Sequence, residues 1–173
     1  MIYALVISRA NGCYRDYFAG PMPSGEQGTP GRGWGTGPAE DSLLLDCALA
    51  VHEPQLRTRL TVLGMPPTVV FWTHFSRLFA GVLPSASFFR LLDALMAEST
   101  NPSAFPHARH GLVDLAFAVL QRLRPELLRC ESALEVQDLI TAQLTGLFDP
   151  EDLSDLMAQA EVSLWSGFTR HEV

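Results

Sequence analysis

The sequence contains no lysine: all twelve of its cationic residues are arginines, and the formal net charge is −7. Phosphate binding needs clustered cations, and these arginines are not clustered, so the sequence argues against a nucleic-acid partner. A basic stripe for an anionic membrane surface is missing for the same reason. Without lysine the chain also has no side-chain ammonium for Schiff-base or P-loop chemistry. Several function classes are therefore excluded by composition.

Cysteine is scarce, and membrane-spanning segments are missing. The three cysteines, Cys13, Cys47 and Cys130, are odd in number and far apart, which favours reduced thiols over a disulfide framework or a zinc site. The apolar run at residues 2–7 is too short to cross a bilayer and follows no basic segment. We therefore predict a soluble cytoplasmic protein with no integral membrane segment.

Catalytic and metal-binding motifs are also absent. There is no Gly-x-Ser-x-Gly, His-Glu-x-x-His or Cys-x-x-Cys sequence. Glycines alternate over residues 31–37, but no strand precedes them, as a phosphate-binding loop would require. His107 and His110 have a metal-ligand spacing without a third ligand. We accordingly predict no catalytic, cofactor-binding or metal-binding residues and no cofactor.

Composition divides the chain into two parts. Residues 1–40 are irregular, and their Gly/Pro-rich stretch buries too little apolar surface to offset chain entropy, so we predict a largely disordered segment. Residues 41–168 show repeated helical periodicity without period-two alternation, which predicts one helical domain. The predicted fold class is all-α, a multi-helix bundle.

Proline, glycine and capping residues mark the expected helix ends. Asp41 or Ser42 is expected to cap the first helix, Gly64 to end the second, and Ser132 with Glu135 to form a capping box. The stretch 109–123 is apolar nearly all round, which predicts the centre of the bundle. A loop is expected at residues 99–107. The predicted helices cover residues 41–51, 54–63, 66–81, 84–98, 109–123, 125–130, 133–147 and 150–165.

Four stretches of the helical part follow one another in a specific order. They are LLLD at residues 43–46, HEPQLRTRL at 52–60, FSRLFAGVLP at 75–84 and FRLLD at 89–93. Together they resemble the C-terminal half of the TBC domain, the GTPase-activating domain of Rab regulators, over residues 41–147 or as far as 165. An apolar helix around 115–120 and the ELL at 126–128 match the family in the same order.

The sequence departs from the family pattern at two tryptophan positions and in its catalytic motifs. Leu92 and His74 stand where the family has tryptophan. The resemblance implies an arginine finger from Ile-x-x-Asp-x-x-Arg and a glutamine from Tyr-x-Gln, and neither motif occurs in the chain. Residues 1–38 do not match the family; a divergent start, an insert and a misassigned exon in a truncated product remain open. We therefore carry over no catalytic residue and predict that the chain is not an enzyme.

Three functions follow as alternatives. The resemblance implies a Rab-GAP TBC protein of vesicle traffic, lacking its fingers here, cytoplasmic or peripheral to endomembranes. A non-catalytic scaffold is the second alternative, because FAGVLP and the ending Leu164-Trp165 are similar to the TBC-type subunit of the tuberous sclerosis complex. An unrelated helical interaction domain is the third. Arg90 and Asp93 are a GTPase contact or, as we favour, a helix-surface pair. A half-domain is also expected to expose the apolar surface that meets its missing half.

Overall fold

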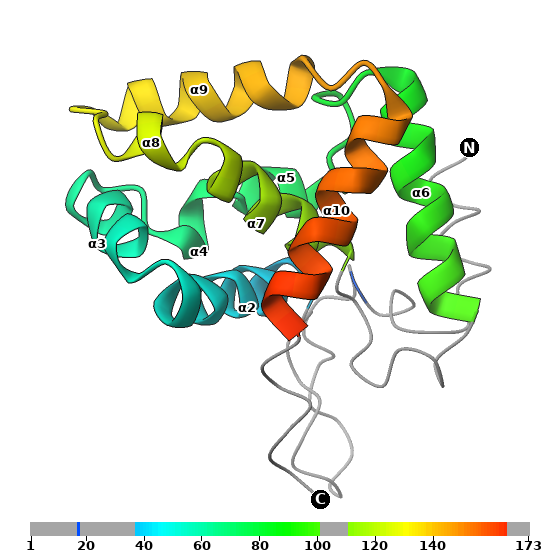
Figure 1. Cartoon of the computed structure of the whole chain (residues 1–173), viewed down its shortest axis with the longest axis horizontal. Helices are drawn as coiled ribbons and strands as arrows, with labels where there is room; N and C mark the ends of the chain where they lie inside the picture. The colour runs from blue at the N-terminus through cyan, green and yellow to red at the C-terminus, as the bar shows by residue number, and fades with distance from the viewer. Residues whose placement is uncertain (1–16, 18–36, 101–110, 166–173) are drawn as a thin grey trace, which may run out of the picture.

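The computed structural model describes residue 17, residues 37–100 and residues 111–165. Within these residues the chain is helical and forms no strand, which confirms the predicted all-α class. Figure 1 shows the arrangement of the helices. They are α2 (Gly37–His52), α3 (Pro54–Val62), α4 (Pro67–Val70), α5 (Trp72–Ser76), α6 (Ser85–Thr100), α7 (Gly111–Arg122), α8 (Arg124–Leu127), α9 (Ala133–Thr145) and α10 (Pro150–Trp165).

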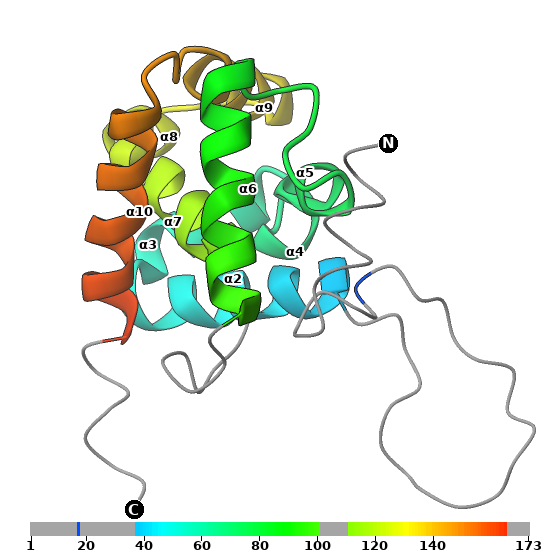
Figure 2. The same ribbon diagram turned by 90° about the vertical axis from the view of Figure 1, so that its right-hand side faces the viewer.

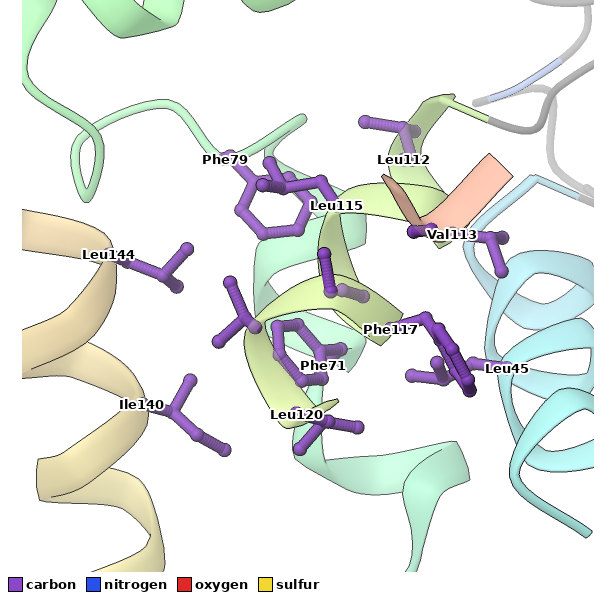
Figure 3. Close-up of a cluster of buried hydrophobic side chains, with 14 of the residues drawn as sticks. Leu45, Phe71, Phe79, Leu112, Val113, Leu115, Phe117, Leu120, Ile140 and Leu144 are labelled. Atoms are coloured by element: carbon purple, nitrogen blue, oxygen red, sulfur yellow. The ribbon is translucent and has the colours of Figure 1, made fainter. Parts of the chain in front are cut away.

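Helix α7 forms the centre of the bundle, as its apolar sequence predicts. Every residue from Gly111 to Leu120 is buried. Figure 3 shows α7 between α9, which contributes Ile140 and Leu144, and α2, which contributes Leu45. Fully burying one leucine or phenylalanine stabilises a fold by about 1.5–3 kcal/mol. The buried leucine, valine and phenylalanine side chains of α7 therefore contribute several such increments to the core.

Helices α6 and α10 pack beside α7 and beside each other. In Figure 2 both run roughly upright, whereas α2 crosses below them. The Oγ atom of Ser87, a buried residue, donates a hydrogen bond to the carbonyl of Leu147. This bond joins the first turn of α6 to the α9–α10 connection. It therefore ties the N-terminal end of α6 to the segment that leads into α10.

Helix α2 begins earlier than its sequence indicates. We expected Asp41 or Ser42 to be the N-cap, but α2 starts at Gly37 and buries both residues. The Ser42 hydroxyl donates to the carbonyl of Pro38 at 2.6 Å, one helical turn back. Asp41 instead accepts a hydrogen bond from Tyr17, 24 residues earlier. The boundary predicted between residues 40 and 41 therefore falls inside a helix.

The segment from residue 66 to 81 is not the single helix that we expected. It forms the short helices α4 and α5, followed by a tight turn in which Leu78 and Phe79 have positive φ angles of 49° and 59°. Non-glycine residues adopt this left-handed region at a cost of about 1–2 kcal/mol each. Both side chains are buried, so tertiary packing overrides the local helical preference.

The other helix ends predicted from the sequence agree more closely with the structure. Helix α3 has Pro54 in its first turn and is followed by Gly64, whose φ angle is +76°. Ser132 Oγ accepts a hydrogen bond from Glu135 N, as a capping box requires. In a capping box the glutamate side chain also accepts a hydrogen bond from the backbone N–H of the N-cap residue. Here Glu135 Oε2 accepts instead from the backbone N–H of Glu131, one residue before Ser132. Asp149 Oδ1 accepts from Glu151 N at the start of α10.

Some predictions concern residues that lie outside the described part of the chain. These are the irregular segment at residues 1–16 and 18–36, the tail after residue 165, and most of the loop expected at 99–107. Ser99 and Thr100 are the exceptions within that loop, because both belong to α6.

Candidate protein-binding surfaces

The structure offers two candidate surfaces, a groove between α6 and α10 and an apolar stripe along α2. His107 and His110, the one metal-ligand spacing noted above, lie outside the described residues. Among the residues that are described, no three histidine, cysteine or acidic side chains are grouped so that they could hold a metal ion.

The groove has a volume of about 340 Å³ and is lined by α6, α7 and α10. Arg90 and Asp93, the pair noted in the sequence, both lie along it. The Arg90 Nε donates to Ser154 Oγ of α10 at 2.8 Å, so this arginine bridges the two helices. The other lining residues are Ala94, Ala97, Asp114, Leu153, Met157, Ala158 and Glu161.

The walls of this groove combine small apolar and charged side chains. Ala94, Ala97 and Ala158 leave room for a side chain from outside, Met157 offers apolar contact, and the buried Asp114 adds a carboxylate to the lining. Exposed charged groups at Arg90, Asp93 and Glu161 surround them. An apolar floor with a polar rim is the usual composition of a protein-binding site. The groove is therefore suited to side chains projecting from a partner helix.

Two other hollows lie elsewhere on the bundle. One, of about 450 Å³, is lined by Gln121, Arg122, Asp152, Asp155 and Gln159 together with Ala118 and Leu156. Another lies between α8 and α9, where burial, with a smaller contribution from Glu135, raises the pKa of Cys130. A raised thiol pKa lowers the thiolate fraction and so disfavours nucleophilic chemistry at this cysteine.

The second surface is the outer face of α2. Leu45 and Leu49 are fully buried on the inner face. On the opposite side Leu43 and Val51 are 58% and 64% exposed, and Leu44 is 39% exposed. The exposed Cys47 and Ala50 complete the α2 stripe, defined here as Leu43, Leu44, Cys47, Ala50 and Val51. Helix α2 thus carries apolar residues on both faces and buries only one.

The α2 stripe has no charged side chain. An ion pair lies at its edge, where Arg57 Nε of α3 donates to Asp46 Oδ1 at 2.7 Å. Exposed apolar side chains elsewhere, such as Val69 on α4 and Leu134 on α9, sit on other elements. A contiguous uncharged stripe is a more informative feature than a single exposed apolar residue.

The sequence indicated parts of these surfaces. It singled out Arg90 and Asp93 as a pair, but the groove also needs α10, whose position follows only from tertiary packing. The apolar character of α2 was visible in the run Leu43-Leu44-Leu45. Apolar residues that recur three and four positions later, at Cys47 and Val51, signal a second apolar face of the helix. The prediction that a half-domain exposes an apolar surface named no residue, so it did not locate the α2 stripe.

Comparisons with known proteins found no matching family model, no matching curated protein and no matching solved structure. Among the helices described, none combines the length and apolar character needed to cross a bilayer.

Proposed function

We propose that this chain is a TBC-type helical module that helps to regulate a Rab-type small GTPase by binding a partner protein. In this proposal the chain supplies no catalytic residue. The groove between α6 and α10 is the observation that carries the binding role, because its small apolar lining and charged rim suit a protein ligand.

Three helix boundaries support the TBC-type assignment. Helix α3 begins at Pro54 in the stretch HEPQLRTRL, α6 begins directly after Leu83-Pro84, and α8 contains the first two residues of ELL. These are the positions at which the resemblance expects helices to begin or turn. The agreement concerns local boundaries, and the assignment remains our proposal.

The chemistry of GTP hydrolysis explains why the role is one of binding. An arginine finger accelerates hydrolysis by neutralising charge on the transferring phosphoryl group, and a glutamine orients the attacking water. The sequence contains neither family motif. Catalysis would therefore require these groups from another polypeptide segment.

The groove favours the scaffold form of this function. The groove has room for single side chains from a partner segment, and an amphipathic helix presents its side chains in a row along one face. A partner with a coiled-coil segment fits this description, as in the tuberous sclerosis complex. The proposed role would place the protein in the cytoplasm, where membrane contact would come through the partner.

A hydrolysis assay and a binding assay test the proposal together. Purified chain is added to GTP-loaded Rab GTPases, one at a time, and we expect the intrinsic hydrolysis rate to remain unchanged. Binding is then measured with the same GTPases and with purified coiled-coil subunits of TBC-containing complexes. We expect one of these proteins to bind and the variant Ala158→Arg, which fills the groove, to weaken binding at least tenfold.

Ala86→Arg is the matched control, because Ala86 is exposed on α6 and does not line the groove. Its binding should equal that of the unchanged chain. Accelerated hydrolysis would contradict the non-catalytic role. Binding that survives Ala158→Arg would show that the groove is not the contact surface.

A further inference from the structure

The groove between α6 and α10 is bounded by two helices that run in the same direction. Ser87, in the first turn of α6, bonds to the carbonyl of Leu147 just before α10. Further along both helices, Arg90 bonds to Ser154. Figure 2 shows α6 and α10 standing side by side. The two walls of the groove therefore run in register, from Arg90 and Ser154 at one end to Glu161 at the other.

The charged side chains of the two walls change sign along this direction. Arg90 lies at the end where the helices begin. Glu161 lies seven residues after Ser154, which places it about 10.5 Å further along and one turn before α10 ends. Asp93 lies between these ends on α6, and all three charged residues are exposed. Because each helix C-terminus carries about −0.5 elementary charge, α6 and α10 add negative potential at the Glu161 end.

The middle of the groove is lined by short side chains. Ala94 of α6 and Ala158 of α10 lie between the charged ends, and Met157 lies beside them. The buried Asp114 belongs to the first turn of α7, where its carboxylate offsets the positive end of that helix. Small residues on both walls let another helix approach closely. Its residues i, i+3, i+4 and i+7 share one face and span about 10.5 Å, the separation between the charged ends of the groove.

We propose that the groove receives a partner helix with a cation opposite Glu161, a small apolar residue opposite Ala158, and a carboxylate opposite Arg90, two turns from the cation. This inference names the chemistry of the partner segment and so rests on the proposed function. Complementary charge fixes which sign meets each end. The Arg90 guanidinium has five N–H donors, and its bond to Ser154 uses one of them, so others can reach a partner carboxylate. A second copy of this chain is a poor occupant, because two chains of net charge −7 repel.

The groove is small, which limits the expected affinity. Its volume of about 340 Å³ lies near the lower end of the range of about 300–1,000 Å³ for ligand pockets. Exposed ion pairs also contribute little each. We therefore expect a dissociation constant between about 10 µM and 1 mM for a single helix.

The test uses two synthetic peptides of about 20 residues, long enough to form a helix. The first is an Ala/Gln helix with arginine at position i, alanine at i+3 and i+4, and glutamate at i+7. The second has the same composition, with both charged residues moved to the opposite face. Both peptides have zero net charge, so general attraction to the acidic chain is the same for each. By fluorescence anisotropy, the first should bind the full chain at least fivefold more tightly.

Charge reversal in the chain tests which end of the groove meets the cation. Glu161→Arg should weaken binding of the first peptide about fivefold, and a peptide with glutamate in place of its arginine should recover that loss. Glu131→Arg makes the same charge change at an exposed position between α8 and α9, outside the groove, and should alter neither peptide's binding. Circular dichroism verifies that both variants keep their helices.

The inference is overturned if the two peptides bind equally, if neither binds below about 1 mM, or if Glu161→Arg leaves the preference unchanged. Its failure is distinguishable from failure of the proposed function. Charge-dependent peptide binding, with no Rab GTPase or coiled-coil subunit bound, would support the groove chemistry and contradict the proposed function. Partner binding that Ala158→Arg blocks, with no charge preference among the peptides, would support the function and contradict this inference.

Discussion

The hydroxyl of Tyr17 donates a hydrogen bond to Asp41 Oδ2 at 2.7 Å, and both residues are buried. The same ring lies so close to Gly37 that a Cβ added there would be 2.3 Å from Tyr17 Cδ2. The residue at position 17 is therefore part of the core around the first turns of α2, although it precedes that helix by 20 positions.

Tyr17→Phe should lower the free energy of unfolding by about 1.5–3 kcal/mol, the range for a hydrogen bond to a charged group. The phenylalanine ring fills the same space, so lost packing contributes little. The measurement is the urea midpoint at constant m-value. Ser163→Ala, which changes an exposed residue, should leave the midpoint unaltered. An unchanged midpoint for Tyr17→Phe would mean that the hydroxyl bond contributes nothing.

Leu120→Ala should cost about 2–5 kcal/mol, because it removes a fully buried side chain from the central helix α7 and leaves a cavity. Chemical denaturation gives the value directly. The matched control is Leu134→Ala, the same substitution at an exposed position of α9, with an expected change within about 0.5 kcal/mol. Equal effects at the two sites would contradict the central position of α7.

Ser132→Ala should cost about 1 kcal/mol, within the range known for loss of an N-cap hydroxyl. The Ser132 Oγ accepts from Glu135 N, and alanine leaves that N–H without its partner. Thermal melts provide the test, and Ser132→Asp should restore most of the loss because aspartate also caps. A melt of Ser132→Asp as low as that of Ser132→Ala would exclude a capping role.

His74 should make stability decrease as the pH falls below about 7. Burial, with a smaller contribution from Arg77, lowers the pKa of His74 in the folded chain. Histidine in the unfolded chain has a pKa of about 6.5, so the unfolded state binds the proton first as the pH falls. Stability is thus full above about pH 6.5 and decreases towards the lowered folded pKa. In His74→Phe this part of the decrease should disappear while the contact with Phe79, whose ring stacks on His74, is kept. Denaturation of both proteins at pH 7 and pH 5.5 makes the comparison, and identical losses would rule out His74.

The sequence predicted those elements whose signals are local. The apolar pattern of α7, Pro54 at the start of α3, and the cap at Ser132 each depend on a few neighbouring residues, and the structure agrees with all three. The start of α2 packs against Tyr17, which approaches from outside the helix. The turn at Leu78 and Phe79 depends on burial of both side chains. Neither cause is visible in the local sequence.

The candidate surfaces divide in the same way. The α2 stripe follows from spacing within one helix, so a sequence reading could have identified it from Leu43, Cys47 and Val51. The groove combines Arg90 and Asp93 of α6 with residues of α10 more than 60 positions later. Such a pairing requires knowledge of how the helices pack, which a single sequence does not supply.

The central position of α7 also constrains the order in which the chain can acquire its structure during synthesis. Helices α2 to α6 leave the ribosome first, but the segment that fills their shared interior is α7, and α10 covers α7 only after almost the entire domain has emerged. A nascent chain ending before residue 150 would hold α7 with one side open to water. Among the described helices, α10 is therefore the last to join the core during synthesis.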